Sequence, residues 1–96
     1  MLRDIIVRKR DQILQVAKKY GASDLKIFGS VIRGENTKES DVDILVTLPK
    51  IYDMFKQRLP LQNELENIIG KKVDLVVKDE LNHLMAQNIL NEAQDL

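Results

Sequence analysis

The sequence contains neither cysteine nor tryptophan, and its 96 residues include only two prolines and four glycines. Because cysteine is absent, disulfide frameworks and thiolate zinc sites are excluded. The 15 basic and 15 acidic residues cancel, which argues against a dedicated binder of nucleic acids or anionic membranes. No apolar run approaches the roughly 18 residues of a membrane span, and residues 1–10 lack the apolar core of a signal peptide. These absences favour a cytoplasmic protein.

The residues that are present have the composition of an ordinary globular fold. Hydrophobic residues make up 44% of the chain, which is too many for a disordered segment. A chain of this length predicts one domain over residues 1–96.

Three segments carry apolar residues at spacings of three and four, the period of an amphipathic helix. They are residues 2–20, 51–69 and 79–93. Pro60 lies within the second segment, so we expect either a kink or two short helices, the second beginning near Pro60. The apolar stripe expected for the last helix comprises Leu81, Leu84, Met85, Ile89, Leu90 and Ala93.

Three short apolar runs, residues 25–28, 41–48 and 72–77, predict strands. Ser23 and Asp24 are expected to form a turn before the first strand. Residues 29–40 are rich in turn formers and predict at most one helical turn, after Ser30. The order of these elements predicts a three-stranded α/β domain whose helices cover the sheet.

Two of the predicted strands contain carboxylates, which is unusual because aspartate is depleted in strands. Asp41 and Asp43 begin the second strand and, with a side-chain period of two, point to the same face. Asp74 interrupts the third strand, and alone it would be an ordinary exposed edge residue. If the two strands are neighbours, the three carboxylates converge, and only protonation or a bound cation relieves their repulsion. Hard oxygen ligands select Mg²⁺ or Mn²⁺.

Gly29 and Ser30 follow the first predicted strand directly. Glycine allows a phosphate to approach the backbone, and the amides at the start of a short helix favour anions. A Gly-Ser pair after a strand is usually an ordinary turn. Here, however, ten residues separate Ser30 from Asp41-Val42-Asp43, and this spaced combination would arise by chance only about once in a thousand.

This spacing resembles the signature of the DNA polymerase β-like nucleotidyltransferase superfamily. The stretch FGSVIRGENTKESDVDILV, followed by KKVDLVV, is similar to the minimal nucleotidyltransferase (MNT) family within it. The resemblance covers nearly the whole chain, and no element of the signature is missing. It implies an α/β (α+β) fold of the minimal polymerase β-like type, a three-stranded mixed sheet packed by about four helices.

The resemblance also implies roles for individual residues. Gly29 and Ser30 match the loop that binds the nucleotide triphosphate, with Arg33 as a further phosphate contact or else a solvated charge. Asp41, Asp43 and Asp74 match the carboxylates that hold two Mg²⁺ ions (or Mn²⁺), and the third can assist deprotonation of the attacking hydroxyl. ATP is the implied substrate.

Members of this kind resemble the antitoxins of HEPN/MNT toxin–antitoxin modules. The resemblance implies an enzyme that transfers AMP to a tyrosine of a HEPN ribonuclease toxin and so silences it. Two alternatives stay open: an antitoxin that masks its partner without catalysis, and nucleotidyl transfer to a small molecule such as an aminoglycoside. A homodimer is also possible, because this sequence shows no second domain to recognise the acceptor.

Overall fold

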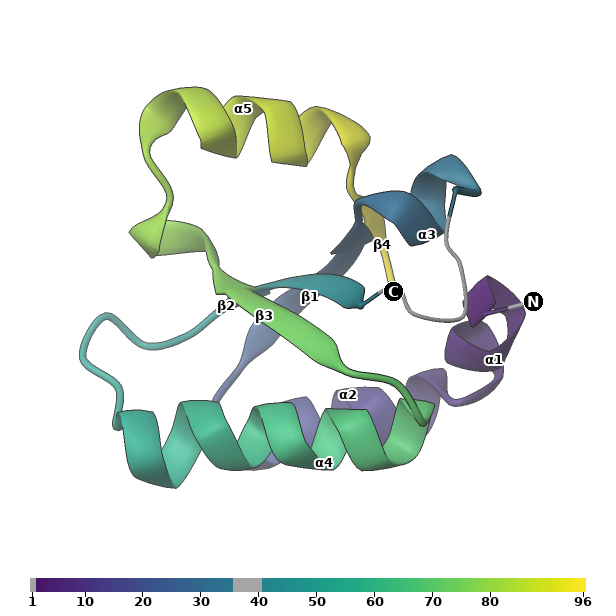
Figure 1. The fold of residues 1–96 in the computed structure, drawn as a ribbon. Coiled ribbons are helices and arrows are strands. Elements are labelled where there is room, and N and C mark those ends of the chain that lie inside the picture. Colours follow the sequence, from purple (N-terminus) through teal and green to yellow (C-terminus); the bar gives the residue numbers. More distant parts are fainter. Residues whose placement is uncertain (1, 36–40) are drawn as a thin grey trace.

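The computed structural model describes residues 2–35 and 41–96 (Figure 1). None of the helices in these two ranges is both long and apolar enough to cross a membrane. The elements in chain order are α1 (Leu2–Arg8), α2 (Arg10–Lys19), β1 (Ser23–Phe28), α3 (Ser30–Arg33), β2 (Val42–Thr47), the π-helix η1 (Met54–Arg58), α4 (Leu59–Ile69), β3 (Val73–Val77), the 3₁₀ turn η2 (Lys78–Glu80), α5 (His83–Glu92) and β4 (Gln94–Asp95).

The sheet is mixed and has the strand order β3-β2-β1-β4. Strand β2 runs parallel to β3 and antiparallel to β1, and β4 is antiparallel to β1. The α/β class and the mixed sheet are confirmed, but the prediction of three strands was wrong. The fourth strand is two residues long, Gln94 and Asp95 opposite Ile27 and Lys26, which is too short to show an alternating pattern.

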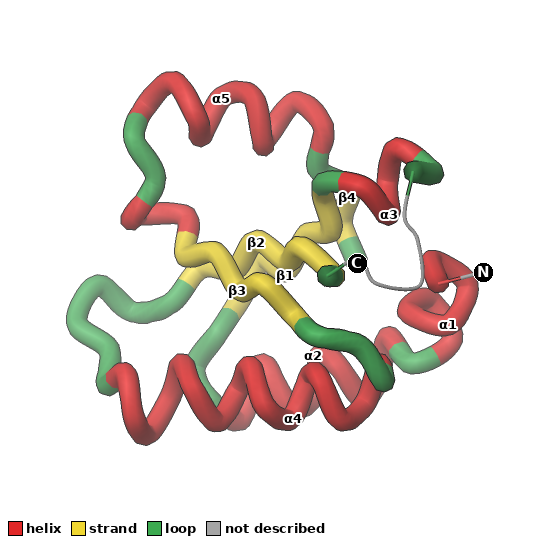
Figure 2. Tube along the Cα trace, in the orientation of Figure 1, coloured by secondary structure: helices red, strands yellow, loops and turns green. Residues whose placement is uncertain are grey.

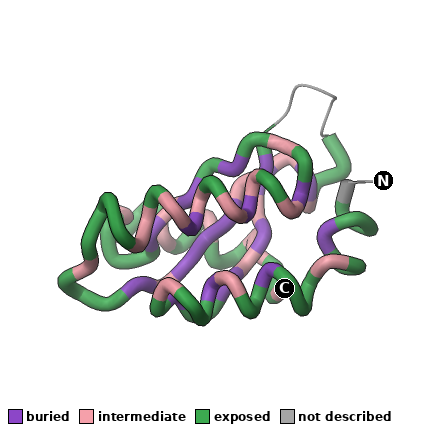
Figure 3. The backbone as a smooth tube through the Cα atoms, turned by 90° about the horizontal axis from the view of Figure 1, so that it is seen from below, coloured by how far each residue is buried: buried purple, intermediate pink, exposed green. Residues whose placement is uncertain are grey.

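Helices cover the two faces of the sheet unequally (Figures 1 and 2). Helices α2 and α4 lie against one face, and α5 lies over the other. The residues of β2 that were predicted to face inward are completely buried between the sheet and the helices α2 and α4. They are Val42, Ile44 and Val46. Figure 3 shows the buried positions along the strands and at intervals along the helices, as expected for one apolar face per element.

The helix predicted over residues 2–20 is two helices, because Lys9, between α1 and α2, does not have helical backbone angles. The side chain of Lys9 also contacts α4, because its Nζ donates a hydrogen bond to the carbonyl oxygen of Ile68 at 2.6 Å. The change of direction allows Ile6 of α1 and Ile13 of α2 both to be fully buried. Ser23 and Asp24 belong to β1 instead of forming a separate turn. Asp24 has a positive φ of 51°, and it lies where the register between β1 and β2 shifts.

The segment around Pro60 is confirmed as two helices. The π-helix η1 ends at Arg58, and α4 begins at Leu59 with Pro60 in its first turn, where proline is common. The last predicted helix is shorter than expected, because Asn82 caps α5 through a hydrogen bond from the amide of Met85. Its predicted apolar stripe is not a core stripe, since no residue of α5 is buried.

We expect Asp53→Ala to lower the free energy of unfolding by about 1 kcal/mol. The carboxylate of Asp53 accepts hydrogen bonds from the amides of Phe55 and Lys56, both at 2.9 Å, and so caps η1. Urea unfolding followed by circular dichroism measures the loss. Asp53→Asn keeps an acceptor oxygen and should retain most of the stability; equal losses in both variants would contradict a capping role.

Candidate active site

The loop between β1 and α3 is built on Gly29. This residue has φ 78° and ψ −149°, a conformation that is essentially restricted to glycine. It precedes the single helical turn Ser30–Arg33, as the sequence predicts. The loop is held close to the start of β2, because Phe28 at the end of β1 lies opposite Asp43.

Gly29 also packs directly against the side chain of Asp43. A Cβ atom on Gly29 would lie 2.1 Å from Oδ2 of Asp43 and 3.0 Å from its Cγ, far inside contact distance. Sequence reasoning assigned this glycine to phosphate approach alone. The structure adds a second requirement, because only a residue without a side chain leaves room for the Asp43 carboxylate.

The predicted convergence of carboxylates is confirmed for Asp43 and Asp74. The two are register partners in the parallel pair β2–β3, so their side chains leave the same face of the sheet. Asp41 precedes β2 by one residue and lies two residues from Asp43. Asp43 is half-buried, while Asp41 and Asp74 are exposed. All three lie at the ends where β2 and β3 begin, and Asp43 lies against Gly29.

The charges of these groups act on one another. The pKa of the Asp43 carboxyl is raised above its usual value, chiefly by burial and further by the negative charges of Asp74 and Asp41. Arg33 acts in the opposite direction, and Glu92 adds to the rise. A bound cation would relieve the repulsion among the carboxylates.

The donor set suits a hard divalent cation, since it consists of carboxylate oxygens alone. Within residues 2–35 and 41–96, no three acidic or histidine side chains are already grouped to hold a metal ion. Asp41 and Asp74 are exposed, so rotation about their side-chain bonds can bring their oxygens towards Asp43. The residues present therefore fit a hard divalent cation such as Mg²⁺ by the chemistry of their donor atoms.

Arg33 is held by two carboxylates. Its Nε donates to Oε2 of Glu35 at 3.1 Å, and its Nη1 donates to Oε1 of Glu92 at 2.6 Å. These contacts raise the pKa of the guanidinium further, the hydrogen bond to Glu35 first and the charge of Glu92 next. Sequence reasoning missed Glu92, because a residue 59 positions away on another helix gives no local signal.

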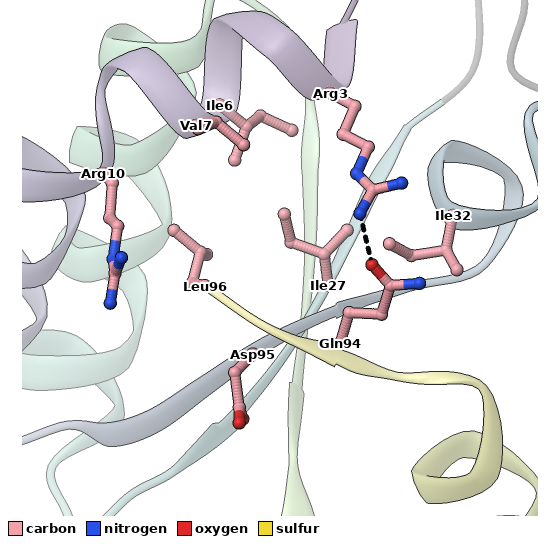
Figure 4. Close-up of a pocket in the computed structure, with 9 residues that line it drawn as sticks. All are labelled: Arg3, Ile6, Val7, Arg10, Ile27, Ile32, Gln94, Asp95 and Leu96. Carbon is pink, nitrogen blue, oxygen red and sulfur yellow. Dashed lines mark hydrogen bonds between the residues drawn. The ribbon is translucent and has the colours of Figure 1, made fainter.

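Two cavities formed by described residues are lined by side chains other than these carboxylates. One of about 310 Å³ is lined by Arg3, Arg10 and Ile27 among others (Figure 4), with Arg3 donating to Gln94 at its edge. Ile27 faces the core between sheet and helices, whereas Asp43 belongs to the opposite face. The candidate active site therefore lies on the other face of the sheet from this cavity, the face over which α5 lies.

Comparison with known proteins places these features in a family. Residues 9–96 match the model of the nucleotidyltransferase domain. A Methanocaldococcus jannaschii protein, proposed to be a protein adenylyltransferase, is 39% identical over 88 residues, which are 91% of this chain and 86% of the relative. The protein adenylyltransferase MntA of Thermococcus cleftensis is 37% identical over 78 residues, 81% of this chain and 78% of that protein.

Solved structures share the fold. A proposed minimal nucleotidyltransferase superposes with a TM-score of 0.84 and 32% identity, covering 99% of this chain and 95% of that one. A toxin–antitoxin complex with AMP-PNP gives a TM-score of 0.74 at 22% identity, covering 88% and 69%. A Shewanella oneidensis complex of a tri-AMPylated HEPN toxin with its MNT antitoxin gives 0.68 at 18%, covering 99% and 71%. The last two similarities show the fold alone.

The family match and the sequence identity to the archaeal relatives agree with the geometry of the Gly-Ser loop and the paired aspartates. The chain therefore belongs to the nucleotidyltransferase domain family and is a nucleotidyltransferase enzyme.

Proposed function

We propose that this enzyme transfers AMP from ATP to a hydroxyl group of a partner protein, in a reaction that depends on Mg²⁺. The observation that carries the proposal is the placement of Asp43, which lies in register with Asp74 and against the backbone of Gly29. One carboxylate thereby links a candidate metal site to a candidate phosphate loop. The relatives named protein adenylyltransferases support a protein as acceptor.

We further propose that the partner is a HEPN ribonuclease toxin, that its acceptor is a tyrosine, and that modification silences it. The support is the shared fold with antitoxins that were solved in complex with such toxins. The exposure of Asp41 and Asp74 also suits a macromolecular acceptor, because a large partner could reach these carboxylates from solvent.

The residues of this chain divide the work of the reaction. Asp41, Asp43 and Asp74 would hold magnesium, which supplies charge neutralisation on the phosphates when it is bound. The amides of the Gly29–Ser30 loop and the Ser30 hydroxyl would bind the β- and γ-phosphates. Two strands fix the position of Asp43, which favours accurate alignment of the reacting groups.

The chemistry is an in-line displacement at the α-phosphorus. The acceptor oxygen forms a bond to that phosphorus, and the bond to the oxygen that bridges to the β-phosphorus breaks, releasing pyrophosphate. The proton of the acceptor hydroxyl must leave, and the exposed carboxylate of Asp74 is available to accept it. AMP then remains on the acceptor as a phosphodiester.

Label transfer tests the proposal. The protein is incubated with Mg²⁺ and ATP labelled at the α-phosphate in a lysate of its source organism, beside Asp41→Ala/Asp43→Ala. We expect a labelled protein band with the wild type only, abolished by EDTA and restored by excess Mg²⁺ or Mn²⁺. Mass spectrometry of that band should show AMP on a tyrosine, and its sequence should identify a HEPN protein.

Other outcomes separate the alternatives. Label on a small molecule would replace the protein acceptor with a small one. No label on any acceptor, while the double variant still binds and neutralises the partner as the wild type does, would support an antitoxin that masks its partner. If label passed to an acceptor from ATP labelled at the γ-phosphate but not from ATP labelled at the α-phosphate, nucleotidyl transfer itself would be refuted.

A further inference from the structure

Arg33 and Glu92 join two segments that are far apart in the sequence. Arg33 ends α3, three residues after Ser30, and Glu92 ends α5. The 2.6 Å contact between Nη1 and Oε1 is the shorter of the two that hold the guanidinium. The Glu92 side chain is 26% exposed, compared with 65% for Glu35, so Glu92 is the less hydrated and better fixed of the two carboxylates.

Strand β4 places Glu92 beside α3. No residue of α5 is buried, so packing of the helix itself does not fix Glu92. Two residues after Glu92, however, Gln94 pairs with Ile27 of β1. Figure 1 shows the C-terminal end of α5 descending to β4 next to α3. The short strand therefore connects the position of Glu92 to the central sheet.

Among the described residues, the two carboxylates that hold the guanidinium use two of its three nitrogens. Its Nε is taken by Glu35 and its Nη1 by Glu92, and neither carboxylate uses Nη2. A guanidinium is planar and rigid, so fixing two of its nitrogens fixes the direction of the third. The charges of both Arg33 and Glu92 act on Asp43, which places the pair within electrostatic reach of the candidate active site.

We propose that Glu92 is a positioning residue for the nucleotide, holding Arg33 so that its remaining nitrogen meets the phosphate groups bound at the Gly29–Ser30 loop. This inference rests on the proposed function, since it takes a nucleoside triphosphate as the ligand. Arg33 is the phosphate-binding group, and Glu92 acts through it. Fork-shaped donors bind phosphate best when their orientation is fixed beforehand.

A simple charge effect predicts the opposite result. Glu92 is negative and near the site, so if it were only a nearby charge its removal would reduce repulsion of the triphosphate and tighten binding. If it positions Arg33, its removal weakens binding. The sign of the change therefore separates the two explanations.

The test is titration calorimetry with α,β-methylene-ATP and Mg²⁺, because this analogue cannot be cleaved between the α- and β-phosphates. We expect Glu92→Ala to weaken binding about fivefold, the range of one exposed ion pair. Glu92→Gln keeps an acceptor oxygen and should recover part of the loss. Asp79→Ala is the control, because it removes an exposed carboxylate that lies before the N-terminal end of α5, far along the chain from Glu92. It should leave the dissociation constant unchanged.

A double-mutant cycle shows whether the effect passes through Arg33. In an Arg33→Lys background, which keeps the charge but not the fork, Glu92→Ala should cause no further loss of affinity. Unchanged or tighter binding by Glu92→Ala in the wild-type background would overturn the inference while leaving the proposed function in place. Absence of nucleotide binding by the folded wild type would overturn both.

Discussion

Replacing Asp43 with asparagine should reduce AMP transfer at least 100-fold without unfolding the protein. Loss of a group that only supports a metal ligand costs about 10–100-fold, and Asp43 is proposed as a ligand itself. An amide cannot supply the negative charge that a hard cation requires. The measurement is the rate of label incorporation from α-labelled ATP, with acceptor and Mg²⁺ in excess.

The stability of Asp43→Asn provides the control. Because burial and the charges of Asp74 and Asp41 disfavour ionised Asp43, the neutral amide should unfold at a temperature equal to or above that of the wild type when no divalent metal is added. Asp79→Asn, which changes an exposed aspartate of η2 in the same way, should retain full activity. A stable Asp43→Asn variant with wild-type transfer would refute the proposed metal site.

Replacing Gly29 with alanine should lower both activity and stability. The new Cβ would lie 2.1 Å from Oδ2 of Asp43, so the carboxylate or the loop must move. A displacement of about 1 Å at a reacting centre can cost about 100-fold in rate, and the same loss is expected here. The backbone conformation of Gly29 adds about 1–3 kcal/mol of strain for any residue with a side chain.

Gly70→Ala separates strain from displacement of the carboxylate. Gly70 also has a positive φ, 79°, but a Cβ there meets no atom within 4 Å. This variant should lose about 1–2 kcal/mol in denaturant unfolding and keep its transfer rate. If Gly29→Ala lost no more activity than Gly70→Ala, contact with Asp43 would not be the reason for the glycine.

The central part of the fold was predictable because its pattern is local. Val42 and Ile44 alternate with Asp41 and Asp43, and this alternation identifies a strand with a buried face, although Leu45 on the opposite face is buried as well. Pro60 has a restricted position in a helix, so it correctly indicated where α4 begins. Each of these signals depends on a few adjacent residues and the stereochemistry of the chain.

The errors came where tertiary contacts outweigh local pattern. The apolar residues of α5 have helical spacing, but Leu84 is 72% exposed and Met85 51% exposed, because spacing does not say whether a partner surface exists. Strand β4 escaped prediction because two residues carry no period. Lys9 was placed inside one long helix because nothing in its neighbours signals the change of direction.

The sequence by itself determined the chemistry of this protein: a Gly-Ser loop, a pair of aspartates after ten intervening residues, and a third aspartate in another strand. These identities fix which groups are available, since charge and donor type belong to the residue. Only the tertiary structure decided that Asp43 and Asp74 are register partners, that Gly29 must lack a side chain beside Asp43, and that Glu92 reaches Arg33. Distances between residues far apart in the chain depend on how strands pair and helices pack, and no short stretch of sequence contains that information.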